Sequence, residues 1–199
     1  MHRKHLSLIV GITIPILVSL LSQYGYLPHA PATTTKTSQS KQYHVGLEVF
    51  GTSSRFHVVK VVDGDTVDIS QGEQGEEREE VFRLRLIGIN TPETVDPRRT
   101  VQCFGKEASN KAKELLSGST VRVELDSSQG MYDKYDRVLA YLILPDGTIF
   151  NEQMIREGYA YEYTYNAPYK YQKQFKTAEQ KAKKEEVGLW SAQTCDGKK

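Results

Sequence analysis

The sequence predicts an α+β domain in which five short β-strands close into a small barrel and three helices pack around it. Segments rich in β-branched residues recur between turns that contain Gly, Asp or Pro, which is the pattern of short strands. One segment with helical periodicity separates the third strand from the fourth, and two more follow the fifth. The chain of 199 residues has room for one ordinary domain with additional segments.

The first two strands are predicted at 56–62 and 66–69 and form a hairpin. The valine-rich first segment is bounded by Asp63-Gly64-Asp65, a tight turn that leads directly into the second segment. Asp-Gly is common in such turns, so Asp63 is expected to serve the turn itself.

The third strand is predicted at 81–89 and carries two arginines on one face. Apolar residues alternate with Arg83 and Arg85, so both arginines lie on the face opposite the leucines. Arg83 is expected to form an ion pair with Glu79 or Glu80.

The remaining elements complete the barrel and its helices. The predicted helices are 105–116, 151–157 and 169–186, and the fourth and fifth strands are 121–125 and 138–144. Small five-stranded sets of this kind often close into a barrel of the oligonucleotide-binding type, the OB-fold.

Residues 1–32 have the pattern of an export signal. Arg3 and Lys4 precede an uncharged apolar run from 6 to 21, and Ala30-Pro31-Ala32 offers a small-residue cleavage site. An uncleaved N-terminal membrane anchor is the alternative. In both cases the rest of the chain is expected outside the cytoplasm: secreted, periplasmic or in the cell envelope.

The folded domain is expected at 55–195, after a flexible linker at 33–54 that is rich in Thr, Ser, Lys and Gln. The chain holds two cysteines, Cys103 and Cys195. An even pair in an exported protein is a plausible disulfide, and two unpaired thiols are the alternative.

The charge balance excludes a protein that coats nucleic acid through bulk positive charge. The formal net charge is +1, and it falls to −1 when Arg3 and Lys4 are left out. A polyanion would therefore have to be bound by a few placed cations.

Four motifs follow one another in a characteristic order. They are Val62-Asp63-Gly64-Asp65-Thr66, the run from Arg85 to Glu93 that ends in Asn90-Thr91-Pro92-Glu93, Asp133-Lys134-Tyr135-Asp136-Arg137, and the run from Asn151-Glu152 to Gly158. In combination they resemble the thermonuclease, or staphylococcal nuclease-like, family over roughly 56–190. The resemblance implies a calcium-dependent, sugar-nonspecific endonuclease that cleaves DNA and RNA, preferably single-stranded, and leaves 3′-phosphates.

The resemblance also implies how the site is divided into roles. The Ca²⁺ ligands would be the Asp65 carboxylate, the side chain of Asn90 and the backbone carbonyl of Thr91, which are oxygen donors of the kind that calcium prefers. Glu93 would act as the general base that activates water.

Two arginines, Arg85 and Arg137, would clamp the phosphate, because a guanidinium offers a planar fork of donors and stays charged. The alternatives are an exposed strand arginine at Arg85, and for Arg137 a surface ion pair with Asp133 or Asp136.

A nucleotide-binding surface is implied by four further residues. Lys134 and Tyr135 would contact a terminal phosphate, and either Tyr163 or Tyr165 would stack on a base with little sequence preference. The alternative is that the tyrosines only cover the barrel.

One position departs from the family pattern. The family commonly has aspartate where this chain has Asn90, and an amide brings no negative charge to a calcium site. Weak but real metal binding is expected, and the alternative is a non-catalytic OB-fold module that binds nucleic acid or protein. Nothing in the sequence implies a stable protein partner, so a monomer is expected, with membrane association only if the N-terminal segment is uncleaved.

Overall fold

The computed structural model describes residues 49–51, 53–71, 80–94 and 100–198. The predicted export signal at 1–32 and the linker up to residue 48 lie outside the described residues. In the part of the chain that is described, no helix is both long enough and apolar enough to cross a membrane.

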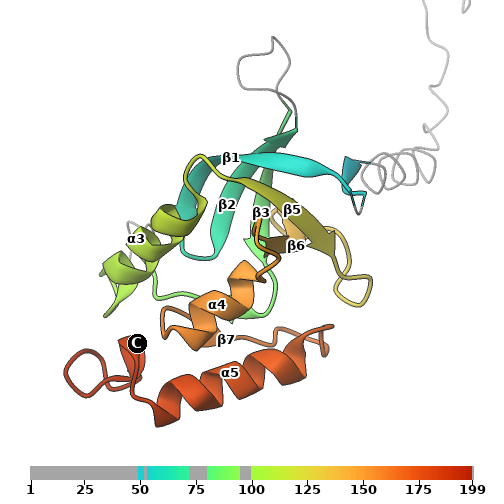
Figure 1. Cartoon of the computed structure of the whole chain (residues 1–199). Helices are drawn as coiled ribbons and strands as arrows, with labels where there is room; N and C mark the ends of the chain where they lie inside the picture. The colour runs from blue at the N-terminus through green and yellow to red at the C-terminus, as the bar shows by residue number, and fades with distance from the viewer. Residues whose placement is uncertain (1–48, 52, 72–79, 95–99, 199) are drawn as a thin grey trace, which may run out of the picture. The chain divides into compact units, whose positions relative to one another are not determined.

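Five strands close into the predicted barrel (Figure 1). They are β1 (Arg55–Asp63), β2 (Thr66–Gln71), β3 (Glu80–Leu86), β5 (Thr120–Leu125) and β6 (Val138–Ile143), in the order β1-β2-β3-β6-β5. Neighbouring strands are antiparallel except β3 and β6, which run parallel. The predicted α+β fold with a five-stranded barrel of the OB type is confirmed.

The barrel interior explains why functional side chains on β3 face outward. All five strands contribute buried apolar residues, which include Phe56, Val58, Val67, Ile69, Leu84, Leu86, Val121, Val123, Ala140 and Leu142. Because successive strand residues point to opposite faces, burial of Leu84 and Leu86 turns Arg83 and Arg85 to the outside of the barrel.

The third strand ends earlier than predicted. β3 stops at Leu86, and Gly88 has a φ of +78°. A Cβ there would lie 2.7 Å from the rings of Tyr169 and Phe175, so only glycine fits without displacing them. The chain then enters a separate short strand, β4 (Ile89–Asn90), which pairs with β7 (Tyr161–Glu162).

The three predicted helices are present, and two of them pack directly against the barrel. α3 (Gly105–Leu116) has the predicted bounds, whereas α4 (Phe150–Arg156) is shifted by one residue and α5 (Gln172–Lys184) is shorter than predicted. α4 packs against both β6 and α5, and it lies between the barrel and α5 in Figure 1. A short 3₁₀ helix, η1 (Gly188–Trp190), follows α5.

Phe50, which precedes the expected start of the folded domain at residue 55, belongs to the hydrophobic core. Phe50 is only 6% exposed. Its ring lies 5.2 Å from that of Phe56 and 5.1 Å from that of Phe82, centroid to centroid. Burial of this aromatic cluster makes residues around Phe50 part of the core.

A disulfide joins Cys103 to Cys195, with the two Cα atoms 5.9 Å apart. It ties the N-terminal end of α3 to the segment after η1, in a small cluster with Tyr161 and Leu189. The bridge spans 92 residues. A loop of that length is expected to stabilise the fold by about 4–5 kcal/mol, because it restricts the unfolded chain.

Candidate active site

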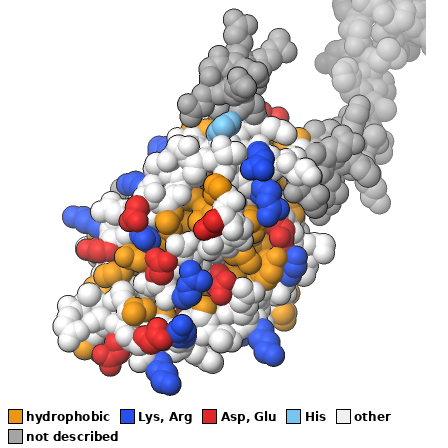
Figure 2. Space-filling view, viewed as in Figure 1, with side chains coloured by type: hydrophobic (Ala, Val, Ile, Leu, Met, Phe, Trp, Pro, Cys, Tyr) orange, Lys and Arg blue, Asp and Glu red, His pale blue; other side chains and the backbone are white. Residues whose placement is uncertain are grey.

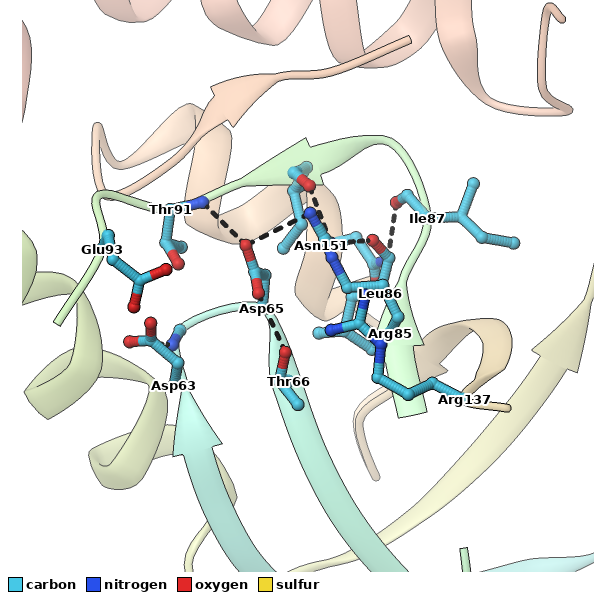
Figure 3. A network of polar contacts seen from close by, with 12 residues as sticks. Asp63, Asp65, Thr66, Arg85, Leu86, Ile87, Thr91, Glu93, Arg137 and Asn151 are labelled. Carbon is cyan, nitrogen blue, oxygen red and sulfur yellow. Dashed lines mark hydrogen bonds and ion pairs between the residues drawn. The ribbon is translucent and has the colours of Figure 1, made fainter. Parts of the chain in front are cut away.

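The principal candidate residues line one cleft of about 490 Å³ beside the turn between β1 and β2. Asp65 comes from that turn, Arg85 from the end of β3, Glu93 from the loop after β4, and Arg137 from the residue before β6. Figure 3 shows the carboxylates of Asp63 and Glu93 on one side of Asp65, and Arg85 with Arg137 on the other. Residues far apart in the sequence are thus brought to a common cleft.

Strand register explains this convergence. Thr66 pairs with Arg85 in the β2–β3 ladder, so Asp65 lies beside the end of β3, and its carbonyl accepts a hydrogen bond from the Leu86 N–H at 3.0 Å. The parallel β3–β6 ladder pairs Arg85 with Leu139. Arg137 directly precedes the first residue of this ladder, Val138, so it lies beside the last residues of β3.

Asp65 is held by three neighbours. Its Oδ2 accepts a hydrogen bond from the Thr91 N–H at 3.0 Å and lies 3.3 Å from Arg85 Nη2. Its Oδ1 accepts a hydrogen bond from the Thr66 hydroxyl at 3.1 Å. With only 8% of the residue exposed, the carboxylate has a fixed direction toward the cleft.

Arg85 is not a freely exposed strand arginine. Its Nη1 donates to the carbonyls of Leu86 at 2.7 Å and Ile89 at 2.9 Å, and its side chain is 14% exposed. These bonds fix the plane of the guanidinium at the edge of the cleft.

Arg137 makes one of the ion pairs that the sequence left open. Its Nε and Nη2 lie 2.8 Å and 2.6 Å from Asp133 Oδ2, whereas no ion pair with Asp136 is found among the described residues. Burial acts to raise the pKa of Asp133, but hydrogen bonds from Arg137 and Tyr135 outweigh it and hold the pKa below its ordinary value. Arg137 lines the cleft while it is paired with Asp133, so the ion pair orients the guanidinium and does not remove it from the cleft.

Glu93 is positioned by a residue that sequence reasoning missed, Gln102. The Glu93 N–H donates to Gln102 Oε1 at 2.8 Å, and the Gln102 N–H donates to the Glu93 carbonyl at 2.9 Å. Glu93 Oε1 also accepts a hydrogen bond from the Thr94 N–H at 3.0 Å. A glutamine in a polar loop gives no sequence signal for this role.

Asp63 serves the turn, as expected, and also adds charge to the cleft. Its Oδ1 accepts hydrogen bonds from the Gly64 N–H at 2.9 Å and from the Thr94 hydroxyl at 2.8 Å. Burial raises its pKa above the ordinary value, and the nearby charges of Asp65 and Glu93 act in the same direction, against the two hydrogen bonds.

An Asp63→Asn variant is therefore expected to be more stable than the wild type at neutral pH without metal. The folded wild type binds a proton at Asp63 more tightly than the unfolded chain, so its stability falls as pH rises from the ordinary pKa of 3.8 through the raised value. The asparagine side chain keeps an oxygen that can accept the hydrogen bond from the Gly64 N–H. It does not ionise, so the variant does not lose stability in this way as pH rises.

Thermal unfolding midpoints in EDTA, measured from pH 3.5 to 7, check this expectation. The advantage of the variant should grow with pH over that range. Parallel pH curves for the two proteins would contradict it.

The donor set in the cleft fits a hard cation. Asp65, Asn90 and Thr91 offer carboxylate, amide and carbonyl oxygens, which suit calcium rather than a soft metal. The Thr91 Oγ1 atom is buried and has no hydrogen-bond partner among the described residues, which leaves a polar group unsatisfied at this point. The described residues contain no cluster of three His, Cys, Asp or Glu side chains able to hold a metal, so a cation here would depend on the amide and carbonyl.

A second, aromatic cleft of about 560 Å³ adjoins the first. All four predicted nucleotide-binding residues line it: Lys134, Tyr135, Tyr163 and Tyr165. Tyr135 and Tyr165 are 66% and 67% exposed, which argues against a purely covering role, and Tyr132 is a further lining residue that the sequence did not single out. Arg85, Asn90 and Arg137 line both clefts, so the two are continuous.

Asn151 supports the site from beneath. It is fully buried; its Oδ1 accepts the Leu142 N–H at 3.0 Å and its Nδ2 donates to the Ile87 carbonyl at 2.9 Å. It thereby ties α4 to β6 and to the turn that leads to Asn90. The sequence marked it only as part of a motif.

No ion pair between Arg83 and Glu80, one of its two expected partners, is found among the described residues. Glu79 lies outside the described residues, and Arg83 pairs with Asp68 across the β2–β3 ladder. The register that places Arg83 opposite Asp68 could not be read from either strand alone.

Comparisons with known proteins agree with the residues assembled here. Residues 83–192 match the family model described as Staphylococcal nuclease homologue. The chain is 39% identical over 136 residues to a protein named Thermonuclease from Staphylococcus hyicus, covering 68% of this chain and 75% of the relative. It is 41% identical over 133 residues to Thermonuclease from Staphylococcus intermedius, covering 67% and 74%. It is 30% identical over 171 residues to Endonuclease YncB from Bacillus subtilis (strain 168), covering 85% and 72%.

Proposed function

The chain belongs to the staphylococcal nuclease family and is a nuclease, and we propose that it is an exported, calcium-dependent endonuclease of low sugar specificity. The observation that carries the proposal is the convergence of Asp65, Arg85, Glu93 and Arg137 on one cleft. A carboxylate beside two guanidinium groups suits phosphodiester hydrolysis, which needs an activated water and stabilisation of charge on phosphate.

In this proposal the two arginines hold the scissile phosphate. Arg85 is fixed by the carbonyls of Leu86 and Ile89, and Arg137 by Asp133, so both forks are oriented before substrate arrives. Preorganised donors of this kind stabilise developing charge without reorganisation.

Glu93 accepts the proton of the attacking water. The new P–O bond forms as the bond from phosphorus to the 5′ oxygen breaks, and the departing 5′ oxygen takes a proton from solvent water. One product then ends in a 3′-phosphate and the other in a 5′-hydroxyl. Asp65, Asn90 and the Thr91 carbonyl would hold a calcium ion, which when bound supplies positive charge beside the phosphate.

The aromatic cleft supports a preference for single strands. Its exposed tyrosines offer flat faces on which unpaired bases stack, and Lys134 with Tyr135 lies where a further phosphate would pass. Figure 2 shows basic and acidic side chains interspersed over the face in view, with hydrophobic ones between them. With a formal net charge of +1, binding would rest on a few placed cations.

Export rests on the pattern of residues 1–32, which lie outside the described residues. The proposal includes a secreted, periplasmic or cell-envelope location, with anchoring to the membrane if the segment stays uncleaved. It also includes action as a monomer without a stable protein partner.

Cleavage of denatured DNA, duplex DNA and RNA, each with calcium or EDTA, tests the proposed function. Calcium-dependent cutting of all three is expected, fastest on denatured DNA, with product ends that phosphatase converts from 3′-phosphate to 3′-hydroxyl. Equal cutting in EDTA, or products with 5′-phosphate ends, would contradict it.

A non-catalytic OB-fold module is the second candidate, because the amide of Asn90 replaces a charged calcium ligand. An Asn90→Asp variant is expected to bind calcium on the order of tenfold more tightly, since ligand charge tunes calcium affinity. Calorimetric titration with calcium, beside cleavage assays on both proteins, checks this. Wild-type protein that cuts nothing while the variant cuts would favour the binding module over the enzyme.

A further inference from the structure

We propose that Arg83 binds the phosphate next to the scissile one, on the side of the active-site cleft away from the aromatic cleft. The inference rests on the proposed function and extends the substrate-binding track by one nucleotide. Arg83 lines the cleft that contains Glu93 and Arg85, and it does not line the aromatic cleft.

The spacing of Arg83 and Arg85 suits two successive phosphates. Both side chains leave the same outer face of β3, two residues apart. Residues at that separation in an antiparallel strand lie about 6.8 Å apart. Successive phosphorus atoms along an extended nucleic-acid strand have a similar separation, so a strand that runs along β3 can meet both arginines.

The orientation of Arg83 is fixed by Asp68. Arg83 Nε donates to Asp68 Oδ1 at 2.7 Å, and Nη2 donates to Oδ2 at 2.9 Å. These bonds use two of the five N–H donors of the guanidinium. Three donors remain on a side chain that is 53% exposed.

The simpler reading is that Arg83 only neutralises Asp68, which is 7% exposed. A structural ion pair would explain the two short bonds equally well. If Arg83 forms only a structural ion pair, the cleavage rate should not depend on Arg83 through the charge of a neighbouring phosphate. If Arg83 binds that phosphate, it should. The experiment must therefore compare substrates and not only proteins.

Three substrates are compared. One is a short, unmodified DNA oligonucleotide with a single cleavage site, and the other two carry a neutral methylphosphonate at the phosphate next to that site, on the 5′ side or on the 3′ side. The readout is the ratio of kcat/KM between the unmodified and each neutral substrate, with calcium at saturation. The test variant is Arg83→Gln with Asp68→Asn, which removes both charges and keeps a hydrogen-bonding pair. The control is Arg122→Gln, an exposed arginine on β5 that lines neither cleft.

The wild type and the control should show a ratio of about ten at one of the two neighbouring positions, the usual scale for a charged hydrogen bond. The double variant should show a ratio near one at that position. It should also lower the slope of log(kcat/KM) against log salt by about 0.7, the loss of one phosphate contact.

Equal ratios in the double variant and the wild type would overturn the inference, and so would wild-type ratios near one at both positions. A general defect in folding would lower all rates but leave the ratio at the wild-type value, so it cannot imitate the expected result. Wild-type protein that fails to cut the unmodified oligonucleotide would overturn the proposed function together with this inference.

Discussion

A Glu93→Gln variant is expected to cleave denatured DNA with a turnover number about 10²–10⁴-fold below that of the wild type. The carboxamide has nearly the same shape but cannot accept a proton from water. The two bonds between Glu93 and Gln102 do not involve the changed side chain, and the amide oxygen of the variant can still accept from the Thr94 N–H, so the loop should keep its position. The loss should therefore fall on kcat, with unfolding temperature and KM little changed.

The matched control is Glu185→Gln, because Glu185 is an exposed glutamate beyond α5 that lines neither cleft. It should cleave at the wild-type rate. Wild-type turnover in Glu93→Gln would remove Glu93 from the chemistry and leave the cleft as a binding site only.

An Arg85→Ala variant is expected to lose about 10²–10³-fold in kcat, the scale for removing one preorganised donor group at a developing negative charge. The carbonyls of Leu86 and Ile89 also lose their donor, so a small fall in stability should accompany the loss. Steady-state kinetics and thermal unfolding, measured on the same preparations, separate the two effects.

Arg85→Lys distinguishes the planar fork from the charge alone. Lysine restores the positive charge but cannot make the same set of bonds to two carbonyls, Asp65 and a phosphate. Only a small part of the rate should return. Full recovery in this variant would mean that Arg85 acts as a simple charge at a distance.

Local sequence patterns were enough to predict much of the fold. Asp63-Gly64-Asp65 between two β-branched segments specified the first hairpin, and the bounds of α3 followed from its periodicity and the Gly118 region. Alternation also placed Arg83 and Arg85 on one outer face. Alternation could not tell the two arginines apart, because both positions point to the same face, and only the motif match selected Arg85. In the structure the Arg83 side chain is 53% exposed and the Arg85 side chain 14%.

What the sequence missed depended on contacts between distant segments. The break at Gly88 arises because Tyr169 and Phe175 occupy the space of a side chain there. Phe50 lies in a segment that the sequence predicts to be a linker, and its place in the core depends on contacts with the rings of Phe56 and Phe82. The role of Gln102 likewise depends on a loop conformation, and no periodicity encodes that.

Calcium binding and cleavage, measured over the same range of calcium concentration, test the central claim most directly. If the Asp65 carboxylate and its neighbours form a catalytic metal site, calorimetric occupancy and the rate of denatured-DNA cleavage should rise together in the wild type. Asp65→Asn should shift both curves to higher calcium by the same factor. Full activity in excess EDTA, or an Asp65→Asn protein that binds calcium as the wild type does, would contradict the account.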